Sequence, residues 1–176
     1  MYPCFRMFGQ LWQFRKAPVL RPFDAHVSHH LCLPWDLDPW WEQNNGRTLT
    51  LYDLGRIPMR RGLGLDPALA AKGWGMTVAG NSTRYRRRVV VFDRPEMRSR
   101  LLGWDARFLY VEQSMWKGAQ CTSQMLVRSA VTSKAGIVPP VELARALGLA
   151  DVSPLLPDWV QAWAAADAKR PWPPLR

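Results

Sequence analysis

The hydrophobic pattern of the chain changes near residue 75. Before that point, residues 46–62 carry apolar side chains around most of a helical circumference, which predicts a helix buried on nearly all sides. After it, strand-like segments are separated by short turns, so consecutive strands are expected to pair antiparallel. The expected strands are 24–33, 75–92 (one strand or two), 97–103, 108–116 and 120–132. The pattern therefore predicts an α+β fold, an antiparallel sheet of about five strands with one long buried helix.

Local signals refine these elements. Asn44 or Asn45 suits the N-cap of the long helix. Pro58 is expected to kink that helix or to end it early, because proline removes a helical hydrogen bond. Gly80 predicts a bulge in the first long strand, and two short amphipathic helices are expected at 141–149 and 158–169.

We expect three parts along the chain. Residues 1–22 form a basic and aromatic N-terminal segment, residues 23–150 the main domain, and residues 151–176 a C-terminal helix with a tail rich in proline and tryptophan. The mixture of aromatic and basic residues in 1–16 is compatible with an interfacial helix and a weak contact with a membrane surface. The alternative, which we favour, is that this segment packs on its own domain or on a partner subunit.

Composition agrees with a globular protein. The chain has 176 residues, 48% of them apolar, which is enough for one domain with a sizeable core. Its three cysteines are widely spaced, so we expect no disulfide framework and a reducing compartment. No apolar run is long enough to span a bilayer and no signal-peptide core is visible, which favours a cytoplasmic location. The three histidines lack metal-ligand spacing, so no metal site is expected.

The net charge of +10 raises the question of a nucleic-acid partner. Arginines cluster at Arg84, Arg86, Arg87 and Arg88, but no nucleic-acid motif accompanies them. Guanidinium groups also bind the phosphates of coenzyme A well. We therefore expect Arg84, Arg86 and Arg88 to bind CoA phosphates, with a solvated strand end as the alternative and no nucleic-acid partner.

Residues 35–47 carry the richest chemistry of the chain. They combine the carboxylates Asp36, Asp38 and Glu42 with Asn44-Asn45-Gly46 immediately before the predicted helix. A carboxylate ahead of a helix start lies beside free backbone N–H groups, which can stabilise an oxyanion while the carboxylate acts as base or nucleophile. The alternative is a turn or cap role for the same side chains.

These residues also carry a resemblance. Asp36-x-Asp38-Pro39, with Asn44-Asn45-Gly46-Arg47 and Asp53-Leu54-Gly55-Arg56 after it, resembles the acyl-CoA thioesterases of the hot-dog fold, closest to the branch with the 4-hydroxybenzoyl-CoA thioesterases. The similarity runs from about Asp24 to about Leu147. It implies a sheet wrapped around a central helix and a homodimer or homotetramer with active sites between subunits.

The resemblance also implies a reaction and the residues that perform it. Acyl-CoA would be the substrate, Asp38 the catalytic carboxylate, and Asn44, Asn45 and Gly46 the groups that polarise the thioester carbonyl. No cofactor is implied beyond the coenzyme A of the substrate.

Two tryptophans and one glutamate complete the expected site. Trp40 and Trp41 could wall an acyl pocket or pack in a core or interface. Many relatives have Gly-His where this chain has Trp41-Glu42, and Glu42 is a candidate second carboxylate. The difference keeps open a catalytically silent protein that binds acyl-CoA or acyl carrier protein. A dehydratase is disfavoured, because those relatives use a histidine at this loop.

Overall fold

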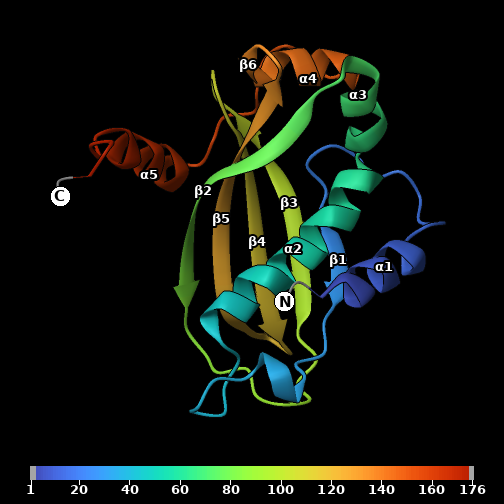
Figure 1. Ribbon diagram of the computed structural model, residues 1–176, viewed down its shortest axis with the longest axis vertical. Helices are drawn as coiled ribbons and strands as arrows, with labels where there is room; N and C mark the ends of the chain where they lie inside the picture. Colours follow the sequence, from blue (N-terminus) through green and yellow to red (C-terminus); the bar gives the residue numbers. More distant parts are fainter. Residues whose placement is uncertain (1–2, 175–176) are drawn as a thin grey trace.

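The computed structural model describes residues 3–174 and has the hot-dog arrangement, with a curved antiparallel sheet wrapped around the long helix α2 (Asn45–Gly62) (Figure 1). The strand order is β1-β3-β4-β5-β2, and β6 pairs with β5. The strands are β1 (His26–His29), β2 (Gly75–Tyr85), β3 (Glu96–Trp104), β4 (Leu109–Lys117), β5 (Gln120–Ser133) and β6 (Gly136–Val138). The other helices are α1 (Cys4–Gln13), the 3-10 turn η1 (Pro34–Asp36), α3 (Leu65–Lys72), α4 (Pro140–Ala146) and α5 (Asp158–Ala168). The predicted fold class is confirmed.

The observed range of α2 agrees with the helix predicted over residues 46–62, but the early end expected at Pro58 does not occur. Asn44 is the N-cap, and its side-chain oxygen accepts hydrogen bonds from the N–H groups of Gly46 and Arg47. The helix does not end at Pro58 but continues to Gly62. Pro58 is buried, so packing on both sides of the helix outweighs the one hydrogen bond that proline removes.

Close packing of α2 on the sheet depends on a glycine. Leu51, Tyr52 and Leu54 of α2 form one core cluster with methionines of β3, β4 and β5. Gly55 faces β3 so closely that an added Cβ would overlap Sδ of Met97. The helix therefore lies nearer to the sheet than a larger residue at this position would permit.

The strand β2 forms one edge of the sheet. It pairs with β5, and its register shifts between Val78 and Gly80, as expected for a bulge at Gly80. The strand ends at Tyr85, because the next two N–H groups, of Arg86 and Arg87, both donate to the carbonyl of Thr122. The opposite edge of β2 pairs with no other strand among residues 3–174.

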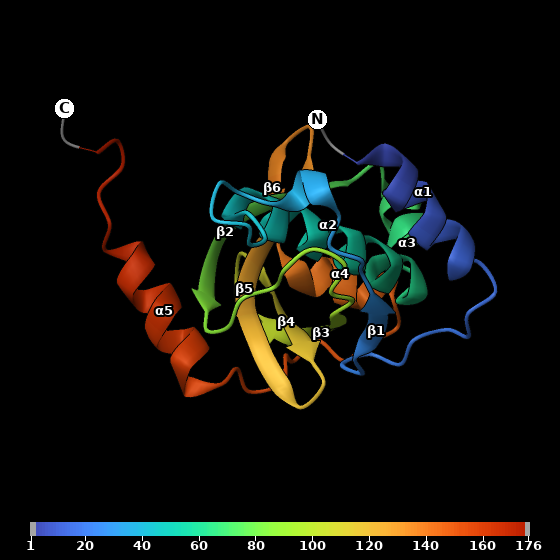
Figure 2. The ribbon, with the colours of Figure 1, turned by 90° about the horizontal axis from the view of Figure 1, so that it is seen from below.

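The two faces of the sheet are covered by different helices. The helix α2 lies on one face, and α5 lies on the other, near β5 and β2 (Figure 2). Val160 of α5 packs with Tyr110 and Leu126, and Asp167 forms an ion pair with Arg128 at 2.5 Å.

The helix α1 packs on the domain with one face only. Arg6 donates to Oδ2 of Asp36 at 2.7 Å, Met7 packs on the core cluster under α2, and the ring of Phe14, just after the helix, meets His26 edge-on. The other face of α1 remains exposed. Within residues 3–174, no helix is both long and apolar enough to cross a bilayer.

Candidate functional site

A closed turn carries the predicted catalytic residues to the start of α2. The N–H of Asn44 donates to the carbonyl of Asp36, and Leu37 bridges to Gln43. The Asp36 side chain is buried and accepts from Arg6 and from the N–H of Leu33. Asp36 therefore holds the turn in place.

Asp38 lies inside this turn and is half-buried. Its Oδ1 accepts from the N–H of Trp40 at 2.9 Å and from that of Glu42 at 3.3 Å. These bonds fix the carboxylate as an Asx-type turn acceptor, which is the alternative that the sequence left open. Oδ2 accepts no hydrogen bond within residues 3–174.

The amides at the start of α2 differ in availability. Oδ1 of Asn44 takes the N–H groups of Gly46 (2.9 Å) and Arg47 (3.3 Å). The N–H of Asn45 has no acceptor in the described part of the chain. Of the three predicted oxyanion residues, Asn45 therefore offers the free amide, whereas the amide of Gly46 is used by the cap.

A polar hollow of about 230 Å³ opens in front of this helix end. Its lining includes Glu42, Gln43, Asn45 and the arginines that follow β2. Glu42 pairs with Arg88 at 3.0 Å. Asp38 does not line the hollow itself, but it binds the backbone N–H of Glu42, which does.

Gln43 is a residue of this hollow that the sequence did not single out. Its side chain is 8% exposed, and Nε2 donates to Oγ1 of Thr48 at 2.7 Å. Oε1 is buried without a hydrogen-bond partner in the described structure. This oxygen has almost no accessible surface, so a water molecule in the hollow does not reach it in this conformation.

The arginines divide between two sides of the sheet. Arg86, Arg87 and Arg88 all line the polar hollow, because the chain leaves the strand geometry after Tyr85. Arg84 instead lines a hollow with Trp159 and Trp163 of α5, on the other face. The structure thus brings together Arg86 and Arg88 of the predicted trio and separates Arg84 from them.

Trp40 and Trp41 lie at the tip of the turn, 74% and 77% exposed. Neither lines the polar hollow or the apolar cavity described next. Trp41 has a φ of 61°, in the left-handed region that favours glycine. Trp41 stands where many relatives have glycine, and its backbone has the conformation that glycine adopts most easily.

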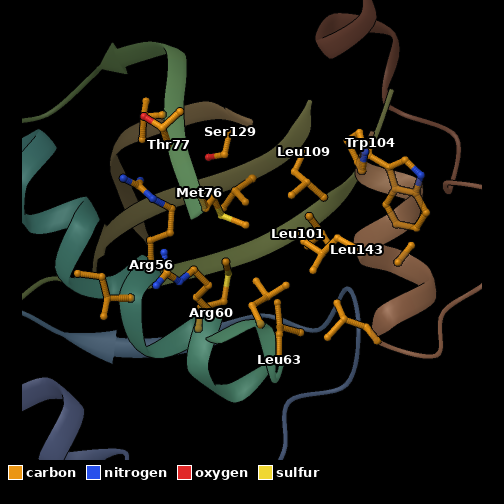
Figure 3. A pocket seen from close by; sticks show the side chains of 18 of the residues that line it. Arg56, Arg60, Leu63, Met76, Thr77, Leu101, Trp104, Leu109, Ser129 and Leu143 are labelled. Carbon is orange, nitrogen blue, oxygen red and sulfur yellow. The ribbon is translucent and has the colours of Figure 1, made fainter. Parts of the chain in front are cut away.

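A second cavity, also of about 230 Å³, lies beneath the C-terminal half of α2 (Figure 3). Aliphatic side chains from β2, β3, β4 and α4 surround it, among them Met76, Leu101, Leu109 and Leu143. Hydroxyl groups of Thr77 and Ser129 and the side chain of Arg56 lie at one end. We call it the apolar cavity.

The polar end of the apolar cavity is electrically balanced. Arg56 forms an ion pair with Asp53, three residues before it on α2, and it donates to Oε1 of the fully buried Gln113 at 2.6 Å. Burial raises the pKa of Asp53, and the Arg56 charge partly offsets this. Arg60 is paired with Asp66 in the same way, at 2.6 Å. The cavity therefore offers an uncharged apolar group a largely aliphatic lining, with the charges at its polar end paired.

Comparison with known proteins defines the class. Residues 32–164 match the model of the Thioesterase-like superfamily, which is more than half of the chain. The chain belongs to this superfamily.

Individual relatives agree with this assignment. The chain is 39% identical over 100 residues to "Protein THEM6" of Xenopus laevis, a match that covers 56% of this chain and 48% of that protein. The chain thus spans about half the length of the curated relatives it matches. The probable thioesterase YbaW of Escherichia coli superposes with a TM-score of 0.62 at 19% identity, over 69% of this chain and 96% of that one. Slr0204 of Synechocystis, a 1,4-dihydroxy-2-naphthoyl-CoA thioesterase, superposes with a TM-score of 0.61 at 9% identity, over 70% of this chain and 94% of that one. At these identities the two structures establish the fold alone.

Proposed function

We propose that the protein is an acyl-CoA thioesterase that works at the polar hollow. The observation that carries this proposal is the turn of residues 36–44. In it Asp38 accepts a hydrogen bond from the N–H of Glu42, Glu42 and Asn45 both line the polar hollow, and the Asn45 N–H has no acceptor in the described part of the chain. Membership of the Thioesterase-like superfamily and the thioesterase structures of the same fold support it.

The reaction adds water across the thioester and releases a free acid and the coenzyme A thiol. Asp38 supplies the carboxylate, either by taking a proton from the attacking water or by attacking the carbonyl itself. The Asn45 N–H, with the positive end of the α2 dipole, stabilises the oxyanion that develops on the carbonyl oxygen.

Arg86, Arg87 and Arg88 bind the phosphates of coenzyme A in this proposal. They lie together at the rim of the polar hollow, and Glu42 neutralises only Arg88 among them. The residual positive charge suits a polyphosphate ligand. No cofactor is required beyond the coenzyme A of the substrate.

The acyl group enters an apolar cavity of a second subunit. Within one chain, the α2 residues that line the apolar cavity lie about 12 Å (Asp53) to about 22 Å (Arg60) from Asn45 along the helix. Antiparallel pairing of the free β2 edges of two copies would bring the start of one β2 beside the end of the other. The polar hollow of one copy would then adjoin the apolar cavity of its partner, which is why we propose a homodimer as the smallest active unit.

Thiol release from a panel of acyl-CoA esters tests the function. We expect turnover of at least one ester by the intact chain and a loss of at least a hundredfold in kcat for Asp38→Asn. Asparagine keeps an Oδ1 that can accept the two turn hydrogen bonds, so the variant removes charge and leaves the fold intact. Full turnover by Asp38→Asn would remove Asp38 from the mechanism, and Glu42→Gln would then test the second carboxylate.

A catalytically silent binding protein is the second candidate. The ion pair of Glu42 with Arg88 favours a binding role. Glu42 stands where many relatives have a histidine, and the ion pair holds its carboxylate away from catalysis. This candidate predicts saturable binding of acyl-CoA or acyl carrier protein with no thiol release from any ester.

A further inference from the structure

The helix α1 has two faces with opposite environments. Its inner face is fixed by the Arg6 bonds to Asp36 and to the carbonyl of Leu31, both at 2.7 Å, and by Met7 in the core. Its outer face carries Phe5, Phe8 and Trp12, which are 93%, 61% and 67% exposed. Their spacing of three and four residues places them in one line along the helix. We call these three residues the aromatic stripe.

Exposure of such a stripe on a firmly held helix needs a physical reason. Single exposed apolar residues are common on protein surfaces, but a contiguous aromatic patch marks an interaction site. Trp35, 64% exposed, lies in η1, whose Asp36 is bound by Arg6 of α1. In Figure 2, α1 and the light-blue turn η1 lie along the same side of the molecule.

The charge around the stripe identifies the partner. Residues 3–23 contain no acidic residue; of their basic residues, Arg6 is paired with Asp36, which leaves Arg15, Lys16 and Arg21. The guanidinium of Arg15 lies 4.0 Å from the centre of the Trp12 ring, at the end of the stripe. A partner must therefore be both apolar and negatively charged. A second copy of this surface would carry the same positive charge and be repelled.

We propose that α1 binds an anionic lipid surface, lying parallel to it with the aromatic stripe in the headgroup region. Phenylalanine and tryptophan on one helix face, with basic residues beside them, are the arrangement that binds the membrane interface. The basic residues add attraction to anionic headgroups, which falls as salt screens it. This proposal goes beyond thioester hydrolysis and does not depend on it.

Vesicle flotation with the full chain tests the proposal. We expect the protein to float with vesicles of phosphatidylcholine and phosphatidylglycerol at low salt, and to bind vesicles of phosphatidylcholine alone at least tenfold more weakly. The triple variant Phe5→Ser/Phe8→Ser/Trp12→Ser should bind about a hundredfold more weakly. The double variant Arg15→Gln/Lys16→Gln should lose about thirtyfold on the anionic vesicles and little on the neutral ones.

A matched control uses exposed apolar residues elsewhere. Val152→Ser/Leu155→Ser removes side chains that are 80% and 87% exposed, and it should float like the unchanged chain. All substituted side chains are at the surface, so thermal melts should stay close to that of the native protein.

Several results would overturn the proposal. One is failure of the intact chain to float with either vesicle, and another is undiminished flotation of the triple variant. If light scattering gives the triple variant a lower molar mass than the intact chain, the aromatic stripe makes contacts between copies of the protein instead. A short DNA duplex is also tested for displacement of the intact chain from the vesicles. If it displaces the triple variant equally well, charge alone accounts for the binding.

Discussion

The two ends of α2 meet spaces of the same size and opposite chemistry. At its start, the polar hollow of about 230 Å³ is lined by Glu42, Gln43 and three arginines. Beneath its C-terminal half, the apolar cavity of about 230 Å³ is lined by aliphatic side chains, and its few charges are paired. One helix thus supplies both the groups suited to a reaction and the groups suited to an apolar chain. In the function proposed above, a thioester substrate uses the two ends of α2 from two different subunits.

The largest effect in this set of predictions should come from the arginines of the polar hollow. Replacing Arg86, Arg87 and Arg88 with glutamine should raise KM for acyl-CoA about a hundredfold with little change in kcat, because several charge-assisted hydrogen bonds to phosphate are lost. An S-acyl pantetheine, which lacks the nucleotide phosphates, should show no such change. Steady-state kinetics on both substrates measures it.

Arg84→Gln is the control for this prediction. Arg84 lies on the other face of the sheet with Trp159 and Trp163, so the variant should behave as the native protein does. An equal rise of KM in Arg84→Gln would mean that CoA lies elsewhere.

Narrowing the apolar cavity should change acyl selectivity. An engineered cavity of about 150 Å³ accepts a benzene ring, so 230 Å³ suits an aliphatic chain of roughly eight to ten carbons. Each methylene buried should raise kcat/KM about fourfold up to that length. Met76→Trp should lower kcat/KM about tenfold for the longest of these chains and leave acetyl-CoA unaffected.

Met76→Leu conserves volume and should keep the native chain-length profile. If Met76→Trp instead leaves the profile unchanged, the acyl group lies outside this cavity. If Trp40→Ala alters the chain-length profile, the acyl group lies at the tip of the turn.

The smallest effect concerns the backbone of the turn. Trp41→Gly should raise the free energy of unfolding by about 1 kcal/mol, because it relieves a positive φ at an exposed side chain. Trp40 is equally exposed but is not among the residues with positive φ, so Trp40→Gly should give no gain. Urea unfolding of both variants measures the difference. A stabilised Trp40→Gly would show that surface aromatics, and not backbone strain, set the effect.

Much of the fold was predictable from the sequence, because periodicity and turn residues act locally. The long helix, one of its two expected caps (Asn44), the start of β2 and the strands from β3 to β5 were predicted with ends close to those observed. The early helix end expected at Pro58 was wrong, because packing around α2 overrides the local preference of proline. The strand of residues 75–92 was expected to include the arginines, but β2 ends at Tyr85, where the N–H groups of Arg86 and Arg87 both donate to the Thr122 carbonyl.

The candidate site was less predictable than the fold. The apolar cavity combines side chains of α2, β2, β3, β4 and α4, so no local segment could reveal it. Gln43 follows no pattern, and only its burial and orphan oxygen single it out. The exposed positions of Trp40 and Trp41 depend on how the turn folds back on α2, which composition does not encode.

Mixing two damaged variants tests the shared site most directly. Chains with Asp38→Asn and chains with Met76→Trp are combined, unfolded, refolded together and assayed on the longest good acyl-CoA. Half of the resulting dimers are mixed, and each mixed dimer contains one native site of two, so the account predicts about a quarter of native activity. Activity no higher than the average of the two variants refolded separately would contradict it, and would place the reaction and the acyl group within a single chain.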